Sequence, residues 1–154
     1  MKIIYARERI DIDKPSVFLA GPTPRDKDTE GWRLEAIRYL NDTDCYILVP
    51  EPRNGRWTKN YIEQVEWEEK ALTSATVILF WIPRNDSTML GLTTNDEWGH
   101  WKTSGKCVLG VPEGAFRTRY QEYYAKKLDI PFSRILSNAC NHVKEKLKSG
   151  GSKG

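Results

Sequence analysis

The sequence predicts an α/β fold in three layers, a mostly parallel sheet of four to five strands with helices on both faces. Short runs of apolar, β-branched and aromatic residues indicate buried strands. Segments with apolar residues at helical spacing alternate with these runs, which is typical of parallel strands joined by helices. A length of 154 residues suits a single domain. We expect this domain over residues 1–148, followed by a flexible tail over 149–154 that is rich in Gly, Ser and Lys.

The first half of the chain contains three of the expected strands. Lys2–Ala6 is expected as an edge strand, and Ser16–Ala20 as a buried one. The second strand stops at Gly21–Arg25, a stiff loop of one glycine and two prolines in which the glycine allows close approach of a ligand. A helix is expected between Asp28 and Asn41, and the strand Cys45–Val49 follows it.

The second half continues the alternation. The run Val77–Ile82, closed by a proline, is expected as the central strand, and Cys107–Val111 as a further buried strand. Helices are expected over Arg117–Lys127 and Ser133–Lys148. The aromatic segment Tyr120–Tyr124 is either a contact or lid, or simply part of a surface helix.

A helix capped by Thr58 is expected before the central strand. Its core-facing residues are expected to be Tyr61, Ile62, Val65, Leu72 and Ala75. Glu68 falls on the same stripe and Glu69 lies near its opposite margin, so spacing alone does not choose between them. The alternative to an inward carboxylate is one at the rim, whose methylene stem covers apolar surface.

The stretch Thr93–Gly99 follows the central strand and its polar loop. Thr94 or Asn95 is a suitable cap for a helix, which places Asp96 and Glu97 in its first turn. Ligands of open α/β sheets bind at this carboxyl edge of the strands. The alternative is that the two acids only complement the helix dipole.

Composition excludes several classes of function. The formal net charge is +3 with scattered basic residues, so no nucleic-acid polymer is expected as a partner. The sequence has no apolar run of membrane-spanning length, and no signal peptide is expected. Three cysteines without paired spacing predict reduced thiols and hence a cytoplasmic location. Two histidines and no Cys/His cluster predict neither a metal nor a cofactor, and the phosphate-binding glycine motifs are missing.

The remaining chemistry is a pair of carboxylates. Two carboxylates serve glycosyl transfer well, because one attacks the anomeric carbon while the other handles the proton of the leaving group. This pattern predicts a carboxylate cleft and leaves its substrate open.

Five segments together resemble the nucleoside 2-deoxyribosyltransferase-like family: Phe18–Arg25, Trp32-Arg33, Trp67-Glu68, Val77–Pro83 and Thr94–Gly99. The resemblance runs from about Lys2 to Pro112. It implies a flavodoxin/Rossmann-like fold and an enzyme that cleaves the N-glycosidic bond of 2'-deoxynucleosides through a covalent glycosyl-glutamate. The sugar then passes to another base.

The resemblance also assigns roles to residues. Glu97, two before Gly99 as in the Glu-Leu-Gly pattern of the family, is the expected nucleophile. Glu68 matches the second family carboxylate, an aspartate eight residues before the central strand, although it is one methylene longer. Residues expected to bind substrate are Ala20, Gly21, Pro22, Arg25, Asp86, Thr94 and Asn95.

Arg25 bears on the choice between substrates. In the related deoxynucleotide N-hydrolases an arginine of this loop grips the 5'-phosphate, so a 2'-deoxynucleoside 5'-monophosphate N-glycosidase is an alternative function. A non-catalytic nucleotide-binding module is another. A nucleoside or nucleotide is the expected small-molecule partner, and the resemblance further implies a homo-oligomer.

Overall fold

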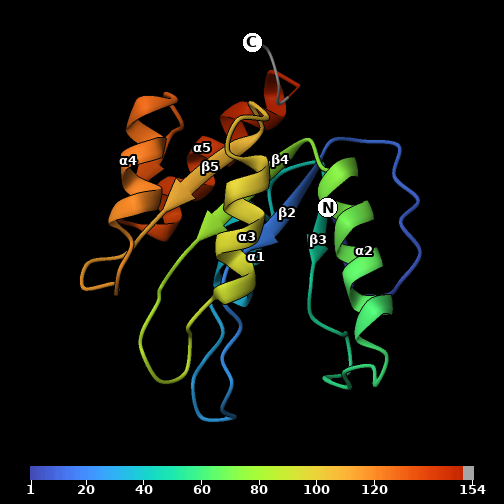
Figure 1. Ribbon diagram of the computed structural model, residues 1–154. Coiled ribbons are helices and arrows are strands. Elements are labelled where there is room, and N and C mark those ends of the chain that lie inside the picture. Colours follow the sequence, from blue (N-terminus) through green and yellow to red (C-terminus); the bar gives the residue numbers. More distant parts are fainter. Residues whose placement is uncertain (151–154) are drawn as a thin grey trace.

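A computed structural model describes residues 1–150 of the chain, and the predicted tail lies beyond this range from residue 151 onward. The described part forms one six-stranded sheet, all parallel, with helices on both faces, which confirms the predicted fold class (Figure 1). In chain order the elements are β1 (Lys2–Tyr5), β2 (Ser16–Ala20), α1 (Arg33–Leu40), β3 (Tyr46–Val49), α2 (Tyr61–Ser74), β4 (Val77–Trp81), α3 (Leu92–Trp101), β5 (Cys107–Gly110), α4 (Arg119–Lys127), β6 (Phe132–Ser133) and α5 (Leu136–Lys148).

The expected strand count of four to five is one too low, because β6 was not predicted. This strand has two residues, Phe132 and Ser133, which pair with Leu109 and Gly110 of β5. Two residues are too short to show the period of a strand in sequence. β6 is a strand only because it pairs with β5, and the local sequence does not show which segment it will pair with.

The strand order places a crevice at the centre of the sheet. The order is β1-β3-β2-β4-β5-β6, so β2 and β4 are neighbours whose crossovers leave in opposite directions. Without the edge strand β1 this is the doubly wound, flavodoxin-like arrangement, in which ligands bind where the order reverses. The loops after β2 and β4 therefore flank the expected binding crevice.

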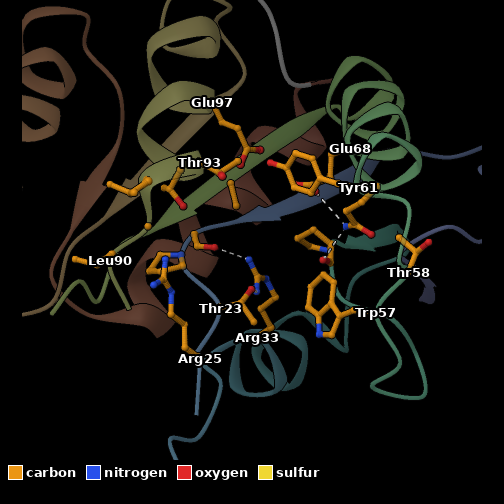
Figure 2. A pocket seen from close by; sticks show the side chains of 18 residues that line it. Thr23, Arg25, Arg33, Trp57, Thr58, Tyr61, Glu68, Leu90, Thr93 and Glu97 are labelled. Atoms are coloured by element: carbon orange, nitrogen blue, oxygen red, sulfur yellow. Dashed lines mark hydrogen bonds between the residues drawn. The ribbon is translucent and has the colours of Figure 1, made fainter. Parts of the chain in front are cut away.

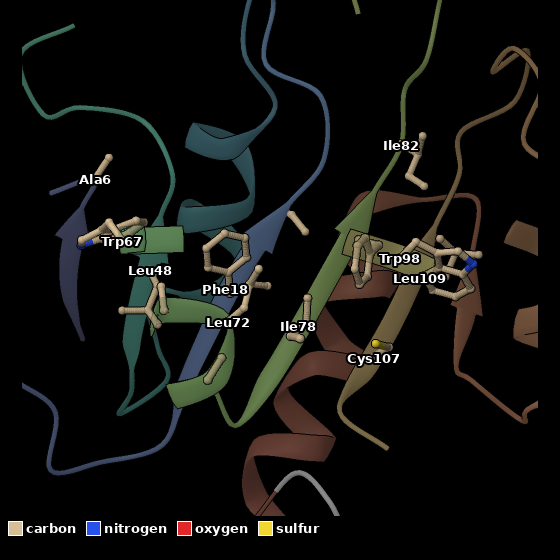
Figure 3. Packing of buried hydrophobic residues seen from close by; sticks show 14 of the residues in the cluster. Ala6, Phe18, Leu48, Trp67, Leu72, Ile78, Ile82, Trp98, Cys107 and Leu109 are labelled. Atoms are coloured by element: carbon tan, nitrogen blue, oxygen red, sulfur yellow. The ribbon is translucent and has the colours of Figure 1, made fainter. Parts of the chain in front are cut away.

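Alternate residues of the strands fill two apolar cores. Phe18, Ile78 and Leu109 pack under α2, α3 and α4 on one face, together with Trp67 and Trp98 (Figure 3). On the other face α1 and α5 cover the remaining strand residues, including Val17, Leu19 and Leu79. Burial of both faces explains why the strands read as continuous apolar runs.

Helix α2 is oriented differently from the prediction. Tyr61, Ile62 and Val65 were expected in the core but are 67%, 60% and 40% exposed, whereas the prediction for Leu72 and Ala75 is confirmed. Tyr61 and Val65 in the first half of α2 line hollows beside the crevice, so this part of the apolar stripe faces open space. The helix is capped by the side chain of Asn60, which accepts the N–H of Ile62, and the predicted cap Thr58 is wrong.

Helix α3 begins earlier than predicted. It starts at Leu92 after Gly91, whose φ of 67° is left-handed, so neither Thr94 nor Asn95 is its cap. Asp96 and Glu97 consequently lie in the second turn. The influence of the helix dipole on acids is strongest in the first turn, so the dipole interpretation of this pair loses its basis.

The three cysteines, Cys45, Cys107 and Cys140, are buried and unpaired within the described residues. Over the same residues, none of the helices has the length and apolar character needed to cross a membrane.

Candidate active site

The loops after β2 and β4 touch each other at the crevice. The backbone N–H of Arg25 donates to the carbonyl of Thr88 at 3.0 Å. Gly21 has a φ of 150°, and a Cβ on it would lie 2.1 Å from the carbonyl oxygen of Trp81. Glycine is therefore required where β2 ends beside β4, because a side chain would separate the two strand ends.

A pocket of about 270 Å³ opens between these loops and the start of α2. Its walls come from the two loops, from α2 and α3, and from the segment after β3. The lining residues are Ala20, Gly21, Pro22, Thr23, Arg25, Arg33, Pro50, Trp57, Thr58, Tyr61, Gln64, Glu68, Leu90, Gly91, Leu92, Thr93, Thr94 and Glu97. The pocket thus brings together both predicted carboxylates and five of the seven predicted substrate-binding residues.

Glu97 reaches into this pocket from the second turn of α3. Burial, the largest cause, and the nearby Glu68 together raise the pKa of its carboxyl to about 8, with Arg33 opposing. Its Oε2 is buried and has no hydrogen-bond partner among the described residues. A carboxyl in this state keeps its proton at neutral pH until a partner or a substrate changes its surroundings.

Glu68 approaches from α2. Figure 2 shows Glu68 and Tyr61 pointing from α2 toward Glu97, with Arg33 below them beside Thr23. The Nε2 group of Gln64 donates to Glu68 Oε2 at 3.1 Å and to the carbonyl of Pro50 at 3.3 Å. Burial raises the pKa of Glu68, against smaller opposing effects of Gln64 and Arg33. Its neighbour Glu69 is exposed, so the structure resolves the ambiguity of the helical wheel.

Arg33 is a site residue that sequence reasoning missed. It is 4% exposed and donates to the carbonyls of Leu19 and Gly21 at 3.0 and 2.7 Å. It also donates to Thr23 Oγ1 at 2.7 Å and to Glu51 Oε2 at 2.9 Å. This guanidinium fixes the loop after β2 and offsets part of the rise in the pKa of both site carboxyls. The one feature of the sequence that could have indicated Arg33 is its position, directly after Trp32 at the start of an amphipathic helix.

Two predicted residues lie outside the pocket. Asp86 is exposed in the loop after β4. Asn95 faces away from Glu97 on α3, and its Oδ1 accepts hydrogen bonds from Arg84 and from Gln121, the latter at 2.9 Å. Thr94 does line the pocket and is 2% exposed. Arg25 lines it with an exposed side chain that has no ion pair within residues 1–150.

A second hollow of about 370 Å³ continues from the carboxylates between α2 and α3. Tyr61, Glu68 and Glu97 line both spaces, and the wall beyond them includes Val65 and Trp101. The carboxyls thus stand where a polar space with two arginines meets a more apolar one.

The geometry suits nucleophilic chemistry at a carbon that carries a leaving group. Two carboxyls near each other with raised pKa values can divide the roles of nucleophile and acid between them. Glu97 and Glu68 fit this division, and the fixed cation of Arg33 beside them limits how much charge repulsion the pair experiences.

The family model described as nucleoside 2-deoxyribosyltransferase like matches residues 14–115. The chain belongs to this family. The matched region runs from before β2 to beyond β5 and therefore contains all the pocket residues. No curated protein matches the chain.

Proposed function

We propose that the protein is a nucleoside 2-deoxyribosyltransferase-like enzyme that acts through a covalent glycosyl-glutamate. Glu97 attacks C1' of a 2'-deoxynucleoside, and Glu68 handles the proton of the departing base. The observation that carries this proposal is the meeting of both carboxyls in one pocket at the reversal point of the sheet. The family match supports the reaction class.

The first step breaks the bond between C1' and the base nitrogen and forms an ester between C1' and Glu97. Glu68 gives its proton to the base, which leaves neutral, and becomes a carboxylate. In the second step the nitrogen of an incoming base attacks C1' and the ester breaks. Its N–H proton passes to Glu68, so both carboxyls return to their starting states. Two inversions at C1' give retention of configuration.

The pair must hold one proton for this cycle to begin. With the pKa of Glu97 raised to about 8 by burial and by Glu68, the pair keeps that proton at neutral pH. Glu97 must lose it before attacking, and Glu68 is the acceptor placed nearby. Substrate binding favours this arrangement, because positive charge developing on the sugar attracts the Glu97 carboxylate in the transition state.

The second candidate is hydrolysis of 2'-deoxynucleoside 5'-monophosphates. Arg25 favours it, because its side chain lines the pocket without a carboxylate partner in residues 1–150. A guanidinium in this state suits a phosphate group. Water would then replace the incoming base in the second step, with Glu68 taking one of its protons.

One chromatographic experiment separates these functions. The enzyme is incubated with a deoxynucleoside and a second base, and separately with a deoxynucleotide alone. A new nucleoside supports transfer, free base alone supports hydrolysis, and neither product indicates a binding module. Glu97→Ala must lose the reaction while still binding substrate. An active Glu97→Ala enzyme would overturn the nucleophile assignment.

Arg25→Ala tests the phosphate contact separately. We expect it to raise KM for a deoxynucleotide by about tenfold or more, the effect of one charge-assisted hydrogen bond. KM for the matching nucleoside should stay within about twofold. Equal effects on both substrates would show that Arg25 does not recognise phosphate.

We also propose that the chain forms a homo-oligomer, as the family resemblance implies. The support is a group of large apolar side chains that remain exposed beside the pocket: Trp57, Tyr61, Ile62 and Leu92 are each more than half exposed. Sedimentation velocity on wild type and on Ile62→Glu tests this. A monomer at all concentrations would contradict it.

A further inference from the structure

A separate pocket of about 490 Å³ lies across α3 from the carboxylates. It is bounded by the loops after β4 and β5, by α3 and by α4. The lining residues are Arg84, Leu90, Leu92, Asn95, Trp98, Phe116, Arg117, Tyr120 and Gln121. It shares Leu90 and Leu92 with the carboxylate pocket, and Glu68 and Glu97 do not line it.

Arg84 in this pocket is a buried cation with neutral partners. It is 7% exposed, donates through Nη1 to the carbonyl of Arg117 at 2.8 Å, and donates through Nη2 to Asn95 Oδ1. No carboxylate within residues 1–150 forms an ion pair with it, and its Nε has no partner there. Burial lowers the pKa of Arg84. Buried charges are ordinarily paired with an opposite charge, and this guanidinium is an exception because it has no counter-charge in residues 1–150.

Other buried polar atoms around the pocket are also without partners. They are the indole Nε1 of Trp98, which is 1% exposed, and Oε1 of Gln121, which is 4% exposed. Buried polar groups in folded proteins are nearly always hydrogen-bonded. Three such atoms on residues that line one pocket indicate a place for a polar ligand.

The rest of the lining is aromatic and cationic. Phe116 and Tyr120 are 37% and 61% exposed, and Leu92 stands on the α3 side at 64%. The guanidinium of Arg117 lies 4.9 Å from the ring centroid of Phe116. The pocket lining thus has two arginines and no acid, with aromatic rings beside them. Such rings stack with flat ligands.

We propose that this pocket binds a small anion carried on a flat ring, an aromatic phosphate or carboxylate. The anionic group supplies the counter-charge that Arg84 lacks, and the ring packs against Phe116 and Tyr120. Phosphate and carboxylate both match the fork of a guanidinium. This site is independent of the proposed glycosyl transfer, because its lining excludes both catalytic carboxylates.

Calorimetric titration of the full chain with phenyl phosphate, benzoate and phenol tests the proposal. Tyr120→Ala removes a ring of the pocket. Tyr123→Ala is its matched control, since Tyr123 is 60% exposed on the same helix and lies outside the pocket. Arg84→Gln removes the cation, and Arg25→Ala reports binding in the other pocket. Titration followed by the indole N–H resonance of Trp98, assigned with Trp98→Phe, locates the ligand.

We expect saturable binding of phenyl phosphate or benzoate, and binding at least tenfold weaker for phenol. Arg84→Gln should weaken anion binding by about tenfold or more, and Tyr120→Ala by about fivefold, with Tyr123→Ala unchanged. If Arg84→Gln does not fold, the tyrosine pair decides. Absence of saturable binding by either anion, equal binding of phenol, or loss through Arg25→Ala with Tyr120→Ala intact overturns the proposal.

Discussion

Replacing Glu97 with glutamine should stabilise the protein at alkaline pH. The carboxyl is buried beside Glu68, and its pKa rises from 4.5 to about 8 in the folded protein. Between these values the folded state binds a proton that the unfolded chain has already released. Stability therefore falls as pH rises through this window, and the full loss is reached above about pH 8. An amide at position 97 cannot ionise and avoids this loss.

The magnitude follows from the same pKa change. Each pKa unit corresponds to about 1.4 kcal/mol, so ionising Glu97 in the folded protein costs at most about 5 kcal/mol. Water entering the open pocket reduces this limit, and we expect about 2–3 kcal/mol. For a chain of 154 residues this corresponds to a Tm difference of about 5–10 °C.

The assay is urea unfolding of wild type and Glu97→Gln at pH 5 and at pH 9. At each pH, the free energy of unfolding of wild type is subtracted from that of Glu97→Gln. This difference should be larger at pH 9 than at pH 5. Any effect of the amide that does not depend on pH cancels in this comparison. The repulsion between Glu68 and Glu97 is already part of the raised pKa of Glu97, so it adds nothing further to this difference. Glu66→Gln, on the exposed side of α2, is the matched control and should show no such change. A difference that is the same at both pH values would refute the reasoning.

Three further outcomes are expected. Glu68→Gln should lower kcat by about a hundredfold, whereas the control Glu69→Gln should leave kcat unchanged. In the wild type, kcat/KM should fall above about pH 8, because the pair then loses the proton that the leaving base needs. Steady-state kinetics from pH 5 to 10 measure both effects. Gly21→Ala should destabilise the protein by about 3 kcal/mol in urea unfolding, because the added Cβ would meet the Trp81 carbonyl. Gly99→Ala should stabilise α3 by about 0.5–1 kcal/mol, because the space around Gly99 is open. Arg33→Met should cost about 3–5 kcal/mol in the same assay, since it leaves Glu51 and two backbone carbonyls without their donor.

The sequence predicted those features that depend on local pattern. Apolar runs located β2 and β4, and the stops after them located both loops of the crevice. Helical spacing left Glu68 and Glu69 as alternatives on α2, and the family resemblance selected Glu68, which the structure has lining the pocket. These predictions succeed because a parallel sheet buried on both faces leaves a strong apolar signal in each strand.

Other features depend on contacts distant in sequence. The outward position of Tyr61 and Val65 follows from where α2 lies relative to the crevice, and the periodicity of a helix carries no such information. Arg33 reads as a surface residue in sequence, because burial of a guanidinium requires acceptors that come from Leu19, Gly21 and Glu51. Asn95 was assigned to the substrate pocket from the family resemblance, although the turn of α3 directs it to the opposite side.

The early start of α3 connects these observations to the chemistry. Because Gly91 adopts a left-handed conformation, the helix begins at Leu92 and Glu97 falls more than one turn inside it. A carboxylate in the first turn would be stabilised by free N–H groups and would keep a low pKa. At position 97 that stabilisation is weaker, and burial with Glu68 dominates instead. The raised pKa, the lost stability at high pH and the proton required by the leaving base therefore have one structural origin, the burial of Glu97 beside Glu68 at a position beyond the first turn.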